Sequence, residues 1–285
     1  MKLIKRAKIN RSHFGNLLIF VFVLVLGLFI ALPFVYAVGN AFKPLNELWI
    51  FPPPLFPRRA TVANFVDLFG LVQNSWVPMT RYFFNTVFIT GVGTAGQVVF
   101  SSMCAYPLAK HKFPGSKLIF RLIFLSLMFG GAVTGVPSYL IMVKLGFIDT
   151  YRAIIIPAMG GTLGLYLMKQ FMEQVNDSII EAAKIDGAGE WKIFWRIVMP
   201  LVKPAWLTVI VLSVQGLWNL GGNVLIYSEQ LKTFSYASAQ IISSGIARAG
   251  VGSALSVVMM TVPIAVFFFT QSSVIQTMTS SGVKE

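Results

Sequence analysis

Acidic residues are scarce in this chain, and none of them lies in the middle of a long apolar run. The ten Asp and Glu residues, in a chain of 285, all fall in loops, at the ends of apolar runs or in the C-terminal tail. Ion-coupled carriers usually bury a carboxylate near the middle of the membrane, where a charge is costly and is kept for function. The sequence therefore argues against a carrier of that class, although an ion site made of backbone carbonyls stays compatible with it.

Cysteine and histidine are almost missing. Cys104 is the single cysteine, so an intrachain disulfide is excluded. The two histidines, His13 and His111, stand among Lys and Arg, and no other ligand-type residue is spaced to join them. We expect no metal site in this chain.

Nucleotide-binding and catalytic patterns are missing as well. The phosphate-binding pattern G-x-x-x-x-G-K-[ST] does not occur, and Gly115-Ser116-Lys117 lacks the glycine spacing that would have to precede it. We expect no catalytic residue and no cofactor in this chain. If the protein drives transport against a gradient, another subunit supplies the energy.

Hydrophobic residues, by contrast, make up 56% of the chain, against 12% charged residues. A soluble chain of this length could not cover such a surface with polar groups. The first apolar run, 17–39, is longer than the roughly 7–15 residues of a signal-peptide h-region, so we interpret it as an uncleaved span. The predicted fold class is all-α integral membrane, with six spans at about 17–39, 83–109, 118–143, 153–172, 205–227 and 253–273.

The 23 basic residues cluster at the ends of the apolar runs, where they set membrane orientation, rather than in a nucleic-acid-binding patch. Most of them fall in alternate segments, beginning with the first. We therefore predict cytoplasmic termini (1–16 and 274–285) and a cytoplasmic loop at 173–204. The segment Phe51-Pro-Pro-Pro-Leu-Phe-Pro57 falls between the first two spans and cannot form a continuous helix or a central strand, so we expect a surface loop there.

The longest polar stretch between apolar runs, Ser178–Pro200, predicts two short helices. Ser178 and Glu181 have the S-x-x-E spacing of a capping box, and small apolar residues follow. Gly187 and Gly189 can take the positive φ that ends a first helix, and Pro200 marks a boundary. We predict a rigid helical elbow whose small residues allow close approach of a partner.

The same stretch contains Glu181-Ala-Ala, Gly187 four residues after Ala183, and Ile197-Val-Met-Pro200. This pattern resembles the EAA motif of type I binding-protein-dependent ABC importer permeases. Other stretches are similar to the carbohydrate-uptake branch, which contains the maltose permease subunits: Ala105-Tyr-Pro-Leu-Ala-Lys110, Val136-Pro-Ser-Tyr-Leu140 and Leu145-Gly-Phe-Ile-Asp-Thr150. The resemblance runs from about Asn64 to the late fifth span. Met199 replaces the usual Leu, and the usual aromatic and acidic residues are missing after Trp218-Asn219, which weakens a sugar identification from that region.

The resemblance implies a coupling helix that docks on an ATP-binding subunit, and a smaller cytoplasmic contact nearby. The alternatives are an amphipathic helix lying in the lipid headgroups and, for the smaller contact, residues that act only as topology signals. The implied coupling residues are Glu181, Ala182, Ala183, Asp186, Gly187 and Ala188, and the smaller contact comprises Tyr106, Lys110 and Phe113.

Amide and indole side chains gather in the fifth predicted span. Gln215, Trp218, Asn219 and Asn223 suit a substrate pathway, because amides bind hydroxyls and an aromatic face packs on a sugar ring. They equally suit hydrogen bonding between helices.

As a whole, the resemblance implies a permease subunit that imports a saccharide by alternating access across a bacterial or archaeal cell membrane. The implied partners are a second permease subunit, expected to be a different chain, two ATP-binding subunits that hold ATP and Mg, and an extracytoplasmic solute-binding protein. The alternatives are a homodimer, a permease for peptides or polyamines, and an ATP-independent channel or carrier.

Overall fold

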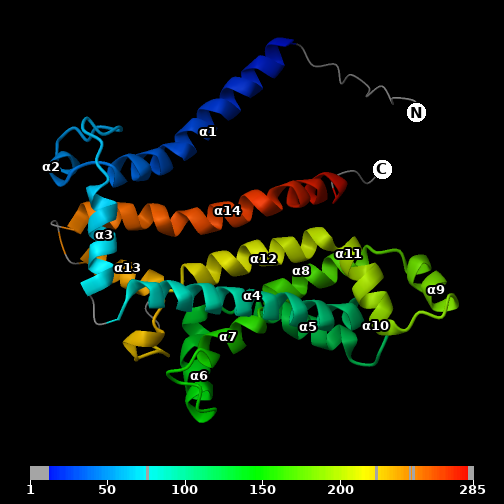
Figure 1. Ribbon diagram of the computed structural model, residues 1–285. Helices are drawn as coiled ribbons and strands as arrows, with labels where there is room; N and C mark the ends of the chain where they lie inside the picture. Colours follow the sequence, from blue (N-terminus) through cyan, green and yellow to red (C-terminus); the bar gives the residue numbers. More distant parts are fainter. Residues whose placement is uncertain (1–12, 75–76, 222–223, 244, 246–247, 282–285) are drawn as a thin grey trace. The chain divides into compact units, whose positions relative to one another are not determined.

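The computed structural model describes residues 13–74, 77–221, 224–243, 245 and 248–281, and in this part of the chain every regular element is helical (Figure 1). The predicted segments 1–16 and 274–285 lie partly outside the described residues. The elements are α1 (His13–Ala41), α2 (Leu45–Leu48), α3 (Ala63–Asn74), α4 (Met79–Lys110), α5 (Ser116–Ser126), α6 (Gly131–Lys144), α7 (Arg152–Met159), α8 (Thr162–Glu173), α9 (Asp177–Ile185), α10 (Glu190–Ile193), the π-helix η1 (Phe194–Val198), α11 (Met199–Leu201), α12 (Lys203–Trp218), the 3-10 turn η2 (Glu229–Leu231), α13 (Phe234–Ser243) and α14 (Ala249–Ser281).

Three of the described helices are long and apolar enough to cross a membrane: α1, α4 and the first part of α14. They coincide with the predicted spans 17–39, 83–109 and 253–273. A fourth candidate is the pair Glu190–Leu201 and Lys203–Trp218, which is bent by 77°. The count of six spans stays a prediction.

The other predicted spans are not continuous helices. The stretch 118–143 is interrupted between α5 and α6, and 153–172 is interrupted between α7 and α8 at Gly160 and Gly161, which are weak helix formers. A Cβ on Gly161 would lie 2.2 Å from the amide nitrogen of Gln97, so the second break is also a place of close packing. The helix of the fifth predicted span, α12, ends at Trp218 rather than near residue 227.

The chain divides into two compact units, Met1–Leu68 with Ser244–Val257, and Phe69–Ser243 with Val258–Glu285. In the larger unit α4 is the central helix and packs on α7, α8 and α12 (Figure 1). Gly93 and Gly96 make this possible. A Cβ on Gly93 would lie 2.7 Å from the side chain of Leu217 in α12, and a Cβ on Gly96 would lie 2.5 Å from the side chain of Met159 in α7. Small residues therefore let these helices approach closely.

The smaller unit is organised around buried Asn64 at the start of α3. Its amide nitrogen donates to the carbonyl oxygens of Ala41, at 2.9 Å, and Lys43, at 2.7 Å. A Cβ on Gly250 would lie 2.2 Å from the amide oxygen of Asn64, so the start of α14 also meets this side chain. One amide thus joins the end of α1, the start of α3 and the start of α14.

Candidate functional site

The predicted elbow is present as a pair of short helices, α9 and α10, and we use the name elbow for residues 176–201. The predicted capping box at its start is wrong. The N-cap is Asn176, whose side chain accepts a hydrogen bond from the backbone N–H of Ser178 at 3.1 Å. Asn caps helices as well as Ser does, and Asn176 has the extended backbone that an N-cap needs. Ser178 and Glu181 therefore lie inside the helix.

The first helix ends as predicted at Gly187, which has a φ of 77°. The N–H of Gly187 donates to the carbonyl of Lys184 at 3.0 Å, and the N–H of Ala188 donates to the carbonyl of Ala183 at 2.9 Å. This pair of bonds is a Schellman motif, which satisfies the last carbonyls of the helix. Gly189, in contrast, has a φ of −70° and is the residue before α10, so it does not need to be glycine for its backbone angle.

Helix α9 has one face in the core of the larger unit and one face outside. Ile180 and Ala183 are buried and pack in a cluster with Met172 and Ile193. Ile185 on the outer face is 87% exposed. Of the predicted coupling residues, Ala183 thus faces the core and Ala188 is half-buried, whereas Glu181, Ala182, Asp186 and Gly187 are exposed.

The second half of the elbow continues past the predicted boundary. Pro200 lies in the short helix α11, and the chain bends at Val202, which has a φ of −95° and a ψ of 22°. Proline is tolerated there because the first turn of a helix does not use its N–H groups. Before Pro200 the turn is π-helical, and the N–H of Met199 donates to the carbonyl of Phe194.

Glu190 joins the two helices of the elbow to α4. Its carboxylate accepts a hydrogen bond from the hydroxyl of Tyr106 in α4 at 2.9 Å and pairs with the ammonium of Lys184 in α9 at 2.7 Å. The Nε2 of His111 lies 3.7 Å away. The bond from Lys184, with smaller contributions from Tyr106 and His111, holds the pKa of Glu190 below its ordinary value. The carboxylate therefore links α4, α9 and α10 at neutral pH.

Lys110 fastens the other end of α9. Its ammonium lies 2.6 Å from the carboxylate of Asp177 and also donates to the carbonyl of Val175. The Lys110 bond holds the pKa of Asp177 below its usual range. Phe113, the third member of the predicted smaller contact, is half-buried in the turn before α5. Tyr106 and Lys110 thus support the elbow from within the chain, a role that the sequence did not reveal, and a contact with a partner stays a prediction.

The proposed pathway residues do not form one wall. Trp218 is 1% exposed, and its indole N–H donates to the carbonyl of Met259 at 2.8 Å. Its ring also meets Phe83 edge to face at 6.0 Å. This arrangement favours the packing alternative for Trp218. Gln215 and Asn219 are exposed, with the Asn219 amide bonded to the carbonyl of Gln215 at 2.9 Å, and Asn223 lies outside the described residues.

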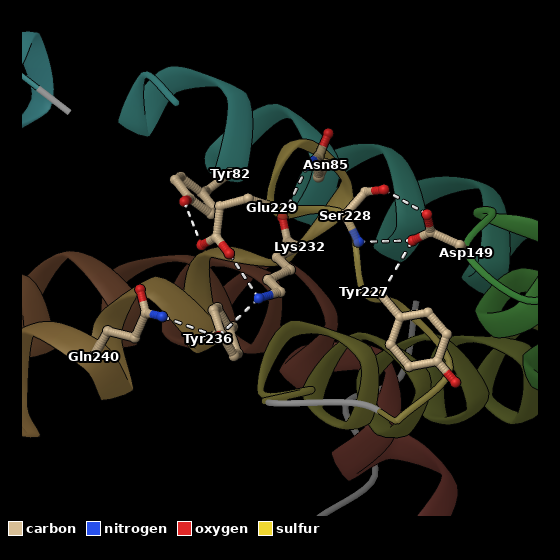
Figure 2. A network of polar contacts seen from close by, with 9 residues as sticks. All are labelled: Tyr82, Asn85, Asp149, Tyr227, Ser228, Glu229, Lys232, Tyr236 and Gln240. Carbon is tan, nitrogen blue, oxygen red and sulfur yellow. Dashed lines mark hydrogen bonds and ion pairs between the residues drawn. The ribbon is translucent and has the colours of Figure 1, made fainter. Parts of the chain in front are cut away.

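A polar network at the other end of α4 was not predicted (Figure 2). Asp149 accepts hydrogen bonds from the N–H groups of Tyr227, at 3.0 Å, and Ser228, at 2.8 Å, and from the Ser228 hydroxyl. Glu229 accepts from the hydroxyl of Tyr82 at 2.7 Å and pairs with Lys232 at 2.6 Å. The network fixes residues 227–232 to the start of α4 and to the turn before α7.

The pKa of Asp149 is held below its ordinary value, chiefly by the Ser228 hydroxyl. Asp149 also has a φ of 60°, which is unusual for a residue other than glycine. Among the residues that the structure describes, no group of three or more His, Cys, Asp or Glu side chains could hold a metal ion.

The chain matches a family model described as the binding-protein-dependent transport system inner membrane component over residues 17–277. Protein LplC of Bacillus subtilis is 36% identical over 196 residues, which are 69% of this chain and 64% of that protein, so the match spans less than two thirds of this relative. The arabinooligosaccharides transport system permease protein AraQ of Bacillus subtilis is 28% identical over 269 residues, 92% of this chain and 94% of that protein.

A solved structure of a bacterial ABC transporter involved in the import of the acidic polysaccharide alginate contains a similar chain. The TM-score is 0.78 at 23% sequence identity, and the match covers 92% of this chain and 98% of that chain. At this identity the likeness shows the fold alone.

Proposed function

The chain belongs to the family of binding-protein-dependent transport system inner membrane components, and from this premise we propose that it is a permease subunit that imports a saccharide. The resemblance of its sequence to the carbohydrate-uptake branch supports the saccharide, as do the names of its relatives, one of which is an arabinooligosaccharides transport system permease protein. Trp218 does not add to that support, because its ring is occupied by packing.

The elbow is proposed to be the coupling helix that docks on an ATP-binding subunit. The observation that carries this proposal is the division of α9 into an anchored face and a free one. A Cβ on Gly187 would meet nothing within 4 Å, so the space beside it is open to a partner. The buried face of α9, together with the contacts of Lys110 and Glu190 that join the elbow to α4, makes the elbow rigid enough to transmit a displacement.

The proposed assembly contains a second permease subunit, two ATP-binding subunits that hold ATP and Mg, and an extracytoplasmic solute-binding protein. This chain contributes six spans, both termini and the elbow lie in the cytoplasm, and no cofactor binds here. Closure of the ATP-binding subunits brings the two coupling helices together and reorients the bundle. The distribution of basic residues supports this orientation.

Orientation is tested by labelling a cysteine in the elbow. We use Gly189→Cys in a Cys104→Ala background, because Cys104 is exposed and would react itself. An impermeant thiol reagent is expected to label this position in inside-out vesicles and to leave it unlabelled on intact cells. Labelling on intact cells would contradict the proposed topology and with it the coupling role.

The transport function is tested by expressing the tagged chain with the proteins encoded beside it and identifying by mass what co-purifies. The complex is then reconstituted in vesicles with its solute-binding protein, and uptake of labelled oligosaccharides, peptides and polyamines is compared. We expect ATP-dependent uptake of a saccharide. Transport by this chain alone, without ATP, would indicate a channel or carrier. Uptake of a peptide or polyamine instead of a saccharide would show that the proposed solute is wrong.

A further inference from the structure

The proline-rich loop after α1 is fastened to the end of that helix by a buried lysine. Lys43 is 1% exposed, and its ammonium donates to the side-chain oxygen of Asn40 at 2.7 Å and to the carbonyl of Pro54. The ammonium also lies 4.9 Å from the centre of the Tyr36 ring. A buried charge is costly unless it is paired in this way, so these contacts specify the course of the loop.

A buried carboxylate fastens the far end of the same loop. Glu47 is buried and accepts hydrogen bonds from the backbone N–H groups of Arg58, at 2.9 Å, and Arg59, at 3.1 Å. Both charged groups of the stretch 43–47 thus point inward and bind backbone. The loop between them has a defined shape even though its prolines prevent a regular element.

The aromatic side chains of this loop point the other way. Phe51 is 93% exposed, Phe56 is 68% exposed, and Trp49 is exposed as well. A surface loop in water usually shows the reverse, with charges outside and aromatic rings covered. Exposed rings held out by buried charges indicate a surface made for a partner.

The position of the loop along α1 identifies that partner. The 29 residues of α1 extend about 43 Å at 1.5 Å per residue, which matches a bilayer with its headgroup layers, about 40–45 Å. A Cβ on Gly39, in the last turn of α1, would lie 2.4 Å from the carbonyl oxygen of Leu55. Phe56 is the next residue, one Cα step of about 3.8 Å away. Phe56 is therefore held near the end of α1, which lies at the headgroup layer when α1 spans the bilayer.

The charge of the loop suits the same partner. Glu47 is the only acidic residue between positions 40 and 62, and it is buried. Arg58 and Arg59 are exposed. Basic side chains next to aromatic rings match an interface in which lipid phosphates lie just outside the acyl chains.

We propose that residues 49–59, which we name the aromatic loop, dock on the lipid interface at the end of α1. The rings of Trp49, Phe51 and Phe56 lie among the headgroups and the first acyl carbons, and Arg58 and Arg59 bind lipid phosphate. The loop then sets the depth of α1 in the bilayer. This role is separate from import of the solute and from the elbow.

The test measures the depth of spin labels in the complete complex in lipid nanodiscs. Labels are placed singly by Phe51→Cys and Phe56→Cys in the Cys104→Ala background. Collision rates with oxygen, which concentrates in lipid, and with a polar nickel chelate, which stays in water, give a ratio for each site. Reference sites are Val25→Cys in the middle of α1 and Asp67→Cys, at an exposed charged position of α3.

We expect the oxygen-to-nickel ratio at both loop sites to exceed that at residue 67 several-fold and to remain below that at residue 25. Arg58→Glu with Arg59→Glu should lower the ratio more in anionic than in zwitterionic nanodiscs. A loop ratio equal to that at residue 67 would overturn the proposal. So would labels that become protected only when the solute-binding protein is added, because the loop would then be a protein-docking surface.

Discussion

Tyr106 and Glu190 meet at 2.9 Å where the longest helix of the larger unit approaches the second helix of the elbow. The ring of Tyr106 also packs on Phe194, with 5.4 Å between ring centres. One residue of α4 therefore holds both the start of α10 and the π-helical turn after it. A displacement of the elbow is expected to move the end of α4 with it, because Tyr106 and Phe194 belong to one close-packed cluster.

Tyr106→Phe removes the hydroxyl and keeps the ring on Phe194. The lost hydrogen bond is expected to cost about 1 kcal/mol, less than is usual for a bond to a charged group, because Glu190 is partly exposed and keeps Lys184. We expect an assembled complex in which more ATP is hydrolysed per solute molecule imported. The measurement is this ratio in reconstituted vesicles, with Tyr166→Phe as a control on another ring. An unchanged ratio would show that coupling does not pass through this bond.

Gly187→Val is expected to weaken retention of the ATP-binding subunit. A β-branched residue in the left-handed region costs roughly 1–2 kcal/mol and also fills the open space beside the helix end. Asparagine adopts the left-handed backbone more readily than valine, so Gly187→Asn tests only the effect of filling the open space beside Gly187. It should have a smaller effect of the same sign. Gly146→Val is the matched control, since Gly146 also has a positive φ with nothing nearby. Pull-down from membranes measures the effect, and wild-type retention in Gly187→Val would refute the coupling role.

Asn176→Ala should destabilise α9 by about 1 kcal/mol, because it removes the N-cap. Ser178→Ala should leave the helix nearly unchanged, since Ser178 lies in the first turn. Amide hydrogen exchange across 177–185 distinguishes the two variants. Glu181→Gln then has no effect on the cap and changes only a charge on the exposed face. Loss of ATP-subunit binding in Glu181→Gln would assign that charge to the partner contact.

The local signals in the elbow explain what could be predicted from the sequence and what could not. Two helices and the left-handed Gly187 follow from spacing within a few residues. The choice of Asn176 over Ser178 does not, because both are good caps and only the backbone decides. The pairs Tyr106 with Glu190 and Lys110 with Asp177 join residues more than 60 positions apart. Hydropathy identified α1, α4 and α14. The break between α7 and α8 could not be predicted in this way, because the close packing of Gly161 on Gln97 leaves no hydropathy signal.

Asp149 predicts a pH dependence for the network of Figure 2. Its pKa is lower in the folded chain than the ordinary value of 3.8, so its stabilising contribution is complete above that value and is lost as the pH falls through the lower, folded pKa. Residues 227 and 228 should stay protected from hydrogen exchange, corrected for its intrinsic pH dependence, down to about pH 4. Asp149→Asn keeps the left-handed backbone and should reduce protection at all pH values, whereas Asp149→Ala adds strain. Loss of protection near pH 6 in the wild type would contradict this assignment.

Trp218→Phe is expected to lower thermal stability, because the partly buried carbonyl of Met259 loses its indole donor. An unsatisfied buried group costs about 1–3 kcal/mol. Asn219→Ala, at an exposed position next to it, should leave the melting temperature unchanged. Differential scanning of the purified complex, followed by uptake assays, separates the roles. A Trp218→Phe complex with normal stability and altered solute preference would return Trp218 to the pathway.

The π-helical turn at Phe194–Val198 makes the direction of the elbow a matter of helical phase. Such a turn contains one residue more than an α-helical turn, and each residue of an α-helix rotates the chain by about 100°. Deleting a single residue from this turn would let an α-helix form and would swing Glu190 about a quarter of a turn away from Tyr106. The number of residues between α10 and Pro200 thus sets the direction in which the exposed face of the elbow points. An insertion or deletion there would rotate that face and leave its residues unchanged.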